Sequence, residues 1–593
     1  MRAVGKILVS LLAIVGVLTL AVVGLAWWGL SHVDVGGSLH KPLPQRIVLH
    51  LPFDRAFPEA EASLTLGGLR GGTALSVRQV IAALDHAAAD PRVVAVVASI
   101  GESGRGMAQA QELRSAVERF RASGKPAIAF ADTLGEGGNG TVDYYLASAF
   151  SEVWMQPSGL LALTGFGIEV PFAQDALTSL GVATEYGQRH EFKNAMDSLV
   201  RQSMSEEHRE SLRALLASFE DQVAHGVAAS RELSVRAVRD ILDGPPLFAD
   251  EAKQAGLLTG TGYWDQILAQ VNALNDGAAP VPLHRYAEGV PPAAPDSAPT
   301  VALIRVTGTI VRGVTDTSPF GTADSSGGDS VAKALRQAID DPKVRGIVLR
   351  IDSPGGSYVA SDTIWREVMR ARERKLPIIA SMGDVAASGG YFAAMGADAI
   401  VAQPGTITGS IGVFALKPVL ADMWGKVNIH WDRVNDGDFA LMWSPNRPFT
   451  AAEQAWFDRM LDTIYRDFTT KAAQSRRLDA AQVDRVARGR IFTGMEAQAA
   501  GLVDALGGLD VAVLHAKRAA GLGDADAVRL TPYPEPKTGL EAIQEMLSGE
   551  EAPMAIATLL RLGGLLAPVA AEIDRAAVSA RGPALMTPPG VGR

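Results

Sequence analysis

The chain has 593 residues, which is too long for a single hydrophobic core and predicts about two to four domains. Its 55 basic and 65 acidic residues give a formal net charge of −10, which argues against a nucleic-acid-binding protein. The absence of cysteine excludes thiol catalysis, disulfides and cysteine-based metal sites. The 10 histidines show no ligand spacing, so we expect no metal ion or other cofactor.

The first element is a charge-free apolar run, Ile7–Leu30. As a helix it would be about 36 Å long, enough to cross a hydrocarbon core of about 30 Å. Arg2 and Lys6 precede it, which favours a cytoplasmic N-terminus. A cleaved signal peptide is the alternative, but the run is longer than a typical apolar signal core. We therefore expect residues 1–45 to anchor the chain in the inner (plasma) membrane through one transmembrane helix, with the rest on the periplasmic, extracytoplasmic side.

The remaining chain contains two related halves. Asp90-Pro-Arg-Val-Val matches Asp341-Pro-Lys-Val-Arg at an offset of 341 − 90 = 251 residues. Lys125-Pro-Ala-Ile-Ala matches Leu376-Pro-Ile-Ile-Ala at the same offset. Such a repeat indicates duplication. Each copy alternates short apolar strands with helical patterns, so we expect a duplicated α/β fold.

The repeat also sets the expected domain boundaries. We predict an N-terminal repeat over 46–273, a linker rich in proline and alanine over 274–300, a C-terminal repeat over 301–535 and a tail over 536–593. Within the tail, Met554–Ile573 is compatible with a helix resting on a partner or the membrane and also with a disordered segment. The role of the tail therefore stays open.

The second copy carries glycine turns after two predicted strands. The apolar run Gly346–Ile351 ends in Asp352-Ser-Pro-Gly-Gly-Ser357, which leaves two adjacent backbone N–H groups unhindered, and we interpret its aspartate as orienting the turn. The strand Leu376–Ser381 leads to Ser388, which precedes a helical pattern. A helix N-terminus favours negative charge developing on such a serine oxygen. The candidate oxyanion donors, among which the sequence does not choose, are Gly355, Gly356 and Gly389.

The first copy differs at these positions. Gly101-Glu-Ser-Gly-Arg105 replaces the Gly-Gly turn, and Thr141-Val-Asp143 stands near the position that corresponds to Ser388. No serine nucleophile is present there. We expect the first copy to act as a scaffold or to supply one catalytic role.

Three motifs of the second copy together resemble one peptidase family. They are Asp352-Ser-Pro-Gly-Gly, Ala386-Ala-Ser-Gly-Gly-Tyr391 and Thr408-Gly-Ser-Ile-Gly-Val413. In this order they closely resemble the signal peptide peptidase A family, in its long two-domain form, over about residues 46–535. The resemblance implies duplicated domains of the Clp-protease or crotonase type.

A serine nucleophile requires a base. The sequence does not exclude His430 or His515, although nothing recommends them. The resemblance implies a lysine instead, because Lys193 in Glu191-Phe-Lys-Asn-Ala-Met-Asp197 corresponds to the lysine of a Gly-x-Tyr-Lys-Ser-Ala-type segment. By the same resemblance Ser410 hydrogen-bonds the lysine amine, with capping of a turn as its alternative role.

The resemblance therefore implies a membrane-anchored serine endopeptidase with a Ser388/Lys193 dyad and no cofactor. Its implied substrates are cleaved signal peptides in or at the membrane, and its implied assembly is a homotetramer. A crotonase-like enzyme acting on acyl thioesters and an inactive membrane scaffold remain alternatives. The sequence gives neither the substrate preference nor the oligomer number, nor whether the dyad forms within one chain or between two.

Overall fold

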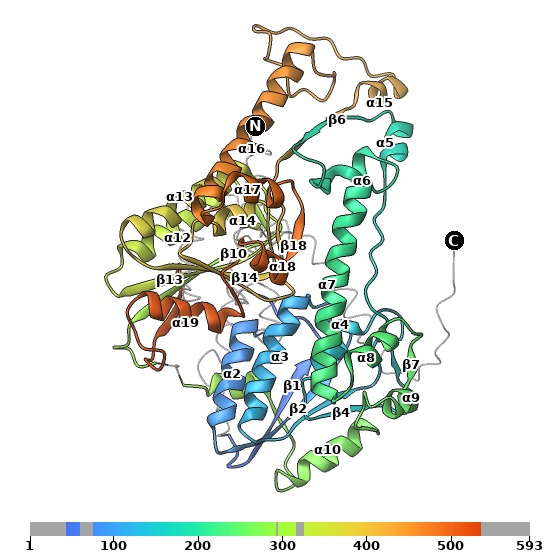
Figure 1. The fold of residues 1–593 in the computed structure, drawn as a ribbon, viewed down its shortest axis with the longest axis vertical. Coiled ribbons are helices and arrows are strands. Elements are labelled where there is room, and N and C mark those ends of the chain that lie inside the picture. The colour runs from blue at the N-terminus through green and yellow to red at the C-terminus, as the bar shows by residue number, and fades with distance from the viewer. Residues whose placement is uncertain (1–42, 60–74, 292–293, 316–324, 535–593) are drawn as a thin grey trace, which may run out of the picture.

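The computed structural model describes residues 43–59, 75–291, 294–315 and 325–534, which form two stacked α/β units (Figure 1). The anchor expected at 7–30 and the tail at 536–593 lie outside these ranges. Within them, no helix combines the length and apolar character needed to span a membrane.

The lower unit in Figure 1 is built on a six-stranded parallel sheet in the order β8-β4-β3-β2-β1-β9. The strands are β1 (Ile47–Phe53), β2 (Val93–Ile100), β3 (Ala127–Ala131), β4 (Glu152–Met155), β8 (Gly260–Thr261) and β9 (Val281–Pro282). Helices α2 (Val77–Ala89) and α3 (Met107–Ala122) cover one face, and α10 (Trp264–Ala273) covers the other. Coverage on both faces explains why the strands read as apolar runs.

The upper unit repeats this plan, with parallel strands in the order β19-β15-β14-β13-β10-β20. The strands are β10 (Thr300–Thr307), β13 (Val344–Ser353), β14 (Ile378–Ala387), β15 (Ala399–Ala402), β19 (Ala505–Leu506) and β20 (Arg529–Pro532), and β16 (Ile407–Gly409) and β18 (Ile491–Thr493) extend from β14. Helices α12 (Gly328–Asp340), α13 (Tyr358–Glu373) and α14 (Gly389–Ala394) cover one face, and α19 (Leu509–Ala519) covers the other. The matching strand order confirms the predicted duplication.

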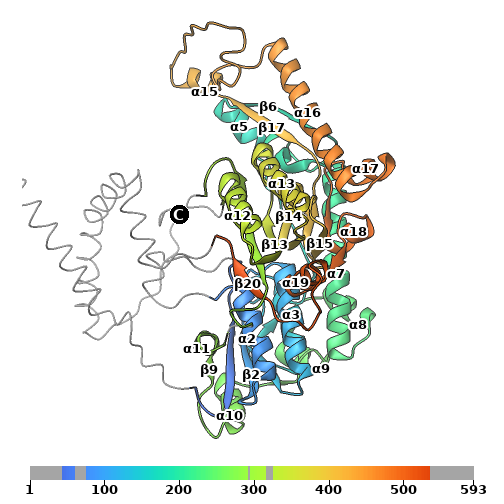
Figure 2. The same ribbon diagram turned by 90° about the vertical axis from the view of Figure 1, so that its left-hand side faces the viewer.

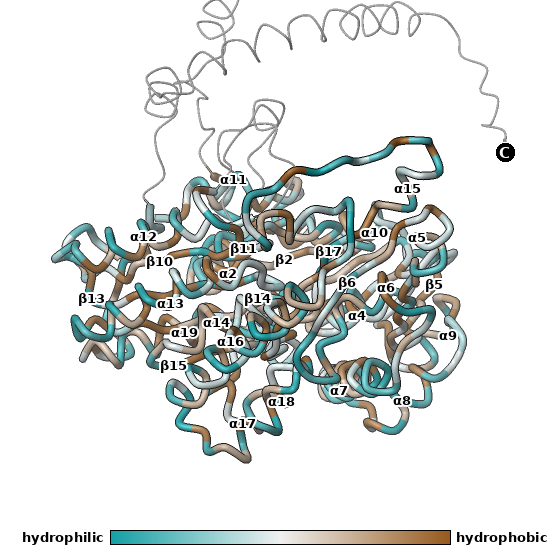
Figure 3. Tube along the Cα trace, turned by 90° about the horizontal axis from the view of Figure 1, so that it is seen from above, coloured by the Kyte–Doolittle hydropathy of each residue, from teal (hydrophilic) through white to brown (hydrophobic). Residues whose placement is uncertain are grey.

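Two long helices extend the correspondence. Helix α7 (Glu206–Arg231) and helix α16 (Ala451–Arg476) each have 26 residues. Each begins at a hydroxyl N-cap and ends at a residue in the left-handed conformation, so the same local signals delimit both helices. Each is followed by a short helix, α8 (Val235–Leu242) or α17 (Ala480–Val486). Seen from above, hydrophilic and hydrophobic residues are interspersed along the described chain (Figure 3).

The segment expected as a linker is in part structural. Within 274–300, β9 pairs with β1, and α11 (Leu283–Glu288) contacts α2 and β1. Val281 and Tyr286 are buried, and the Tyr286 hydroxyl donates to Asp90 at 3.0 Å. The Pro- and Ala-rich composition did not indicate these two short elements, because both depend on contacts with distant parts of the first repeat.

An arm joins the two repeats near the upper end of the molecule (Figure 2). Strand β6 (Ala183–Gln188) of the first repeat pairs antiparallel with β17 (Phe414–Val419) of the second. Helices α5 (Gln174–Leu180) and α15 (Ala421–Lys426) flank this pair. The arm carries a segment of the first repeat onto the second.

Candidate active site

Ser388 lies at the carboxyl end of β14, in the N-cap position of α14. Its backbone has φ 54° and ψ −115°, a conformation that serine rarely adopts. Its N–H donates to the Gly409 carbonyl at 2.9 Å, which fixes the bend. Ser388 is partly exposed while Ala387 and Gly389 are buried, so at this bend the serine is the residue accessible to solvent.

The Gly355-Gly356 turn lies against this bend. Their φ angles are 102° and 151°, in the region that favours glycine. A Cβ atom on Gly355 would lie 2.5 Å from the Gly389 nitrogen, so this close approach also requires glycine. The Gly355 N–H donates to Ser353 Oγ at 3.1 Å. The N–H groups of Gly356 and Gly389 have no hydrogen-bond partner among the described groups.

Lys193 reaches this site from the other repeat. It follows β6 of the arm, and its side chain is buried, with 3% of the residue exposed. Its Nζ lies 3.0 Å from Ser388 Oγ, 2.9 Å from Ser410 Oγ and 2.8 Å from the Ser410 carbonyl oxygen. The structure thus brings all six predicted site residues together within one chain.

Contacts between the repeats hold the Lys193 segment in place. The Arg488 guanidinium binds the Glu191 carboxylate with distances of 2.7 and 3.1 Å. The Phe192 N–H donates to the Arg488 carbonyl at 3.2 Å. Gly489, at φ 91°, makes room for the segment, because a Cβ atom there would lie 2.6 Å from the Lys193 nitrogen.

Burial sets the protonation of Lys193. Desolvation lowers the pKa of its amine from 10.5 to about 7. A neutral amine has two N–H groups and one lone pair. The Ser410 carbonyl and hydroxyl oxygens can accept the two N–H groups, which leaves the lone pair for the hydroxyl of Ser388. Ser410 itself has φ 52°, and its N–H donates to the Arg490 carbonyl at 2.8 Å.

The two histidines considered as alternative bases lie elsewhere. His430 is exposed in the loop after α15. His515 lies on α19, which packs on the face of the second sheet opposite α14. Among the described residues neither makes a hydrogen bond to Ser388.

Asp352 and Ser353 divide the role that the sequence assigned to Asp352 alone. The Asp352 carboxylate accepts from the Val385 N–H at 2.9 Å, so it fixes β14 rather than the Gly-Gly turn. Burial raises the pKa of this carboxyl. Ser353 holds the turn, because its Oγ accepts from Gly355 and donates to the Gly308 carbonyl at 2.5 Å. The signal for Ser353 was its place two residues before a glycine, where serine often caps a turn.

The corresponding place in the first repeat contains an ion pair. Gly140 is the N-cap of α4 (Thr141–Ala147) and so corresponds to Ser388 more closely than the Thr141 segment does. Arg105 Nε lies 3.1 Å from Asp143 Oδ1, and the Ser103 hydroxyl donates to the same oxygen at 2.7 Å. Both side chains of the ion pair are buried. In the described part of the chain no three His, Asp or Glu side chains are grouped to hold a metal ion.

Comparison with known proteins agrees with this organisation. The profile of peptidase family S49 matches residues 119–277 and 370–523, one stretch in each repeat. The chloroplastic serine protease SPPA of Arabidopsis thaliana is 30% identical over 519 residues, covering 85% of this chain and 75% of that protein. Protease 4 of Salmonella typhi is 29% identical over 494 residues, covering 81% and 77%. A protein of Enterococcus faecium named putative signal peptide peptidase SppA is 30% identical over 194 residues, covering 33% and 56%.

These findings show that the protein is a serine peptidase with a duplicated α/β fold. The chain belongs to peptidase family S49, and its two matched repeats make it a member of the long, two-domain SppA type.

Similarity to solved structures is weaker. A mutant of ClpP1 from Listeria monocytogenes aligns with 13% identity and a TM-score of 0.22, covering 35% of this chain and 91% of that one. A score this low does not establish a shared architecture. The relationship to Clp proteases or crotonases therefore stays a prediction.

Proposed function

We propose that the protein is a membrane-anchored serine endopeptidase in which Ser388 is the nucleophile and Lys193 is the general base. The distance of 3.0 Å between Lys193 Nζ and Ser388 Oγ carries this proposal. Burial supports it further, because a lysine with a pKa of about 7 is largely neutral in mildly alkaline solution and can accept a proton.

The reaction proceeds in two stages. Lys193 removes the Ser388 proton as the oxygen attacks the peptide carbonyl, and then gives that proton to the leaving amine. The N–H groups of Gly356 and Gly389 stabilise the oxyanion, because they are free while Gly355 is engaged with Ser353. A water molecule then hydrolyses the acyl-enzyme with Lys193 again as the base. Ser410 orients the amine through both stages.

The substrates that we propose are cleaved signal peptides, in line with the name of the Enterococcus relative. The charge-free run Ile7–Leu30 serves as the anchor in the inner membrane, and both repeats lie on the extracytoplasmic side. We further propose assembly as a homotetramer. No observation favours the acyl thioester or scaffold alternatives over a peptidase.

Turnover of a peptide substrate tests the dyad. Ser388→Ala and Lys193→Ala should each lower kcat by about a thousandfold or more, because each removes a group that the acylation step needs. Lys333→Ala, on the exposed surface of α12, is the matched control and should keep kcat unchanged. Near wild-type turnover by folded Lys193→Ala would reject the dyad.

A further inference from the structure

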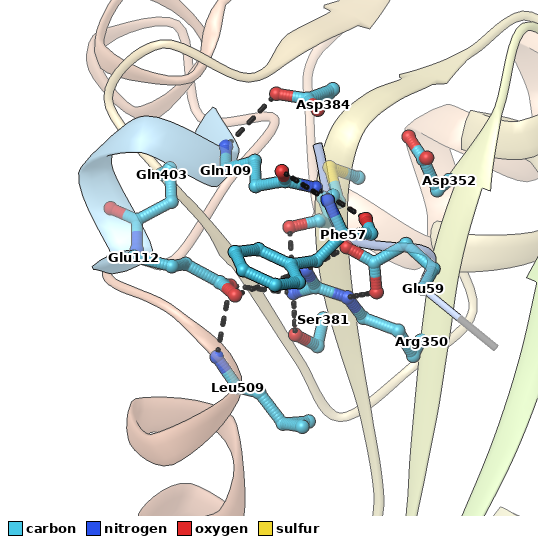
Figure 4. A network of polar contacts seen from close by, with 12 residues as sticks. Phe57, Glu59, Gln109, Glu112, Arg350, Asp352, Ser381, Asp384, Gln403 and Leu509 are labelled. Atoms are coloured by element: carbon cyan, nitrogen blue, oxygen red, sulfur yellow. Dashed lines mark hydrogen bonds and ion pairs between the residues drawn. The ribbon is translucent and has the colours of Figure 1, made fainter. Parts of the chain in front are cut away.

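A buried arginine, Arg350, joins the two repeats next to β13 and β14 (Figure 4). We call Arg350 and its partners Glu59 and Glu112 the junction. Arg350 of β13 binds Glu59 of the first repeat through Nε at 2.9 Å and a terminal nitrogen at 2.7 Å. Its other terminal nitrogen donates to Glu112 at 2.7 Å, to Ser381 Oγ at 3.1 Å and to the Met382 carbonyl at 3.2 Å. The Arg350 and Glu112 side chains are each 3% exposed. One guanidinium thus connects both repeats with β13 and β14.

Helix caps exchanged between the repeats strengthen this junction. Glu112, on α3 of the first repeat, also accepts from the Leu509 N–H at 3.2 Å and so caps α19 of the second. Asp384, on β14 of the second repeat, accepts from the Gln109 N–H at 3.0 Å and so caps α3 of the first. Both helices have glycine in their own N-cap position and make no side-chain cap of their own. Each repeat therefore supplies a cap that the other lacks.

The junction lies at the base of the two segments that carry the reaction. From Arg350, β13 runs two residues further to Asp352 and then enters the Gly355-Gly356 turn. From Ser381, β14 runs to the bend at Ser388. The Asp352 carboxylate ties the two segments together through a β14 amide at 2.9 Å. A shift in the position of Arg350 would therefore also shift the Gly355-Gly356 turn and Ser388.

The junction is not a remnant of the duplication. At the repeat offset of 251, the residue corresponding to Arg350 is Ser99, since 350 − 251 = 99. The residue corresponding to Glu112 is Thr363, since 112 + 251 = 363. Ser99 bonds His50 within its own repeat at 2.8 Å. The ion pairs of the junction therefore have no counterpart at the corresponding positions of the other repeat, and their arginine lies in the repeat that carries Ser388.

Charge balance makes the junction sensitive to single changes. Burial raises the pKa of Glu112 to about 7 even though Arg350 opposes the shift. Burial acts in the same direction on Glu59, but Arg350 outweighs it and lowers the pKa of that carboxyl. Loss of the Arg350 charge would leave the Glu59 carboxylate uncompensated, whereas loss of the Glu112 charge would leave Arg350 paired with Glu59 and would remove one hydrogen-bond acceptor from the cluster. A substitution that keeps the side-chain volume, such as Glu112→Gln, can therefore alter the hydrogen bonds of Arg350 without leaving a cavity.

We propose that Arg350 and Glu112 are positioning residues, which hold the Ser388 strand and the oxyanion turn in register with the Lys193 supplied by the first repeat. This inference rests on the proposed Ser388/Lys193 chemistry and adds the device that aligns its two halves. Misplacement of catalytic groups by about 1 Å can cost about a hundredfold in rate. The effect falls on the chemical steps rather than on substrate binding, so kcat changes while KM is largely kept.

The test compares Glu112→Gln and Arg350→Lys with Arg119→Gln. Arg119, on the same helix α3, also bridges the repeats, but its ion pairs with Asp85 at 2.9 Å and Asp510 at 3.0 Å are partly exposed. The hydrogen bonds of its side chain within the described residues go to these two carboxylates and not to β13 or β14. The readouts are kcat and KM on a peptide substrate, the rate of Ser388 labelling by a fluorophosphonate and the midpoint of thermal unfolding. We expect both junction variants to lose about tenfold or more in kcat and labelling rate, with KM within about twofold. Arg119→Gln should keep all three kinetic values.

Wild-type kcat and labelling rate in folded Glu112→Gln would overturn the proposal. An equal loss in Arg119→Gln would also overturn it, because any loosening of the interface would then suffice. If Arg350→Lys does not fold, the isosteric Glu112→Gln decides the question. Failure of the proposed function has a different signature, since the wild-type enzyme would then show no labelling at Ser388.

Discussion

At the scale of single residues, the Lys193 amine combines burial with a complete set of neutral hydrogen-bond partners. No carboxylate contributes to its pKa shift, which comes from desolvation. The Ser410 oxygens and the Ser388 hydroxyl surround Nζ at 2.8 to 3.0 Å. A carboxylate in their place would raise the pKa of Lys193 and keep it charged. The neutral surroundings thus suit a base rather than an ion pair.

The pH dependence of activity follows from this pKa. Lys193 must be neutral to act as the base, so kcat/KM should rise as the pH passes through about 7 and level off above it. The measurement is kcat/KM for a peptide substrate from about pH 5 to about pH 9, with a stability control at each pH. A flat profile across this range, or a fall, would contradict the assignment.

Stability should depend on the same group with a defined sign. The folded pKa is about 7 and the ordinary value is 10.5, so between these values the unfolded state binds more protons. Lys193 therefore destabilises the fold increasingly as the pH falls from 10.5 to about 7, by about 1.4 kcal/mol for each pH unit. The free energy of unfolding of Lys193→Met, measured with denaturant, should therefore increase relative to that of the wild type by about 1.4 kcal/mol for each unit that the pH falls within this range. A difference that does not change across this pH range would show that Lys193 is charged when folded.

At the scale of elements, the glycines around the site show which segments must approach closely. Gly489→Ala should displace the Lys193 segment, because its Cβ would lie 2.6 Å from the Lys193 nitrogen. We expect kcat to fall about tenfold or more. Gly501→Ala is a matched control, since Gly501 also has a left-handed φ of 78° but its Cβ would meet only a leucine methyl group at 3.4 Å. Equal kcat losses in both variants would assign the effect to backbone strain alone.

Local patterns predicted the elements better than their contacts. The apolar runs before Asp352 and Ser388 became β13 and β14, and the glycine turns lie where the sequence placed them. Ser353 was overlooked because a hydroxyl in a turn has many equivalent uses. The junction of Arg350 with Glu112 was overlooked because its partners are 238 positions apart. Arg350 and Glu112 lie in no motif, and only the packing of the repeats brings these two residues together.

At the scale of the whole molecule, the site is completed by the duplication. The second repeat carries Ser388 and the Gly355-Gly356 turn, and Lys193 follows β6, the strand of the first repeat that pairs with β17 in the arm (Figure 2). In the proposed mechanism these groups supply the nucleophile, the oxyanion donors and the base. The first repeat has an Arg105–Asp143 ion pair where its own site would lie. Of the two roles expected for the first copy, a scaffold or a supplier of one catalytic group, the proposed dyad corresponds to the second.

Mixing two inactive variants tests whether one chain provides the whole dyad. Lys193 and Ser388 belong to one chain in this structure, so a co-assembled mixture of Ser388→Ala and Lys193→Ala chains should stay inactive. Turnover by the mixture well above that of either variant would indicate that the dyad forms between chains. Wild-type chains mixed with Ser388→Ala chains provide the positive control.

Covalent labelling tests the central claim most directly. The wild-type chain and Lys193→Ala are treated with a fluorophosphonate, and intact mass and peptide mapping follow. The Ser388/Lys193 account predicts one adduct, on Ser388, that is lost in the folded Lys193→Ala variant. An adduct on another residue, or full labelling of Ser388 without Lys193, would contradict it.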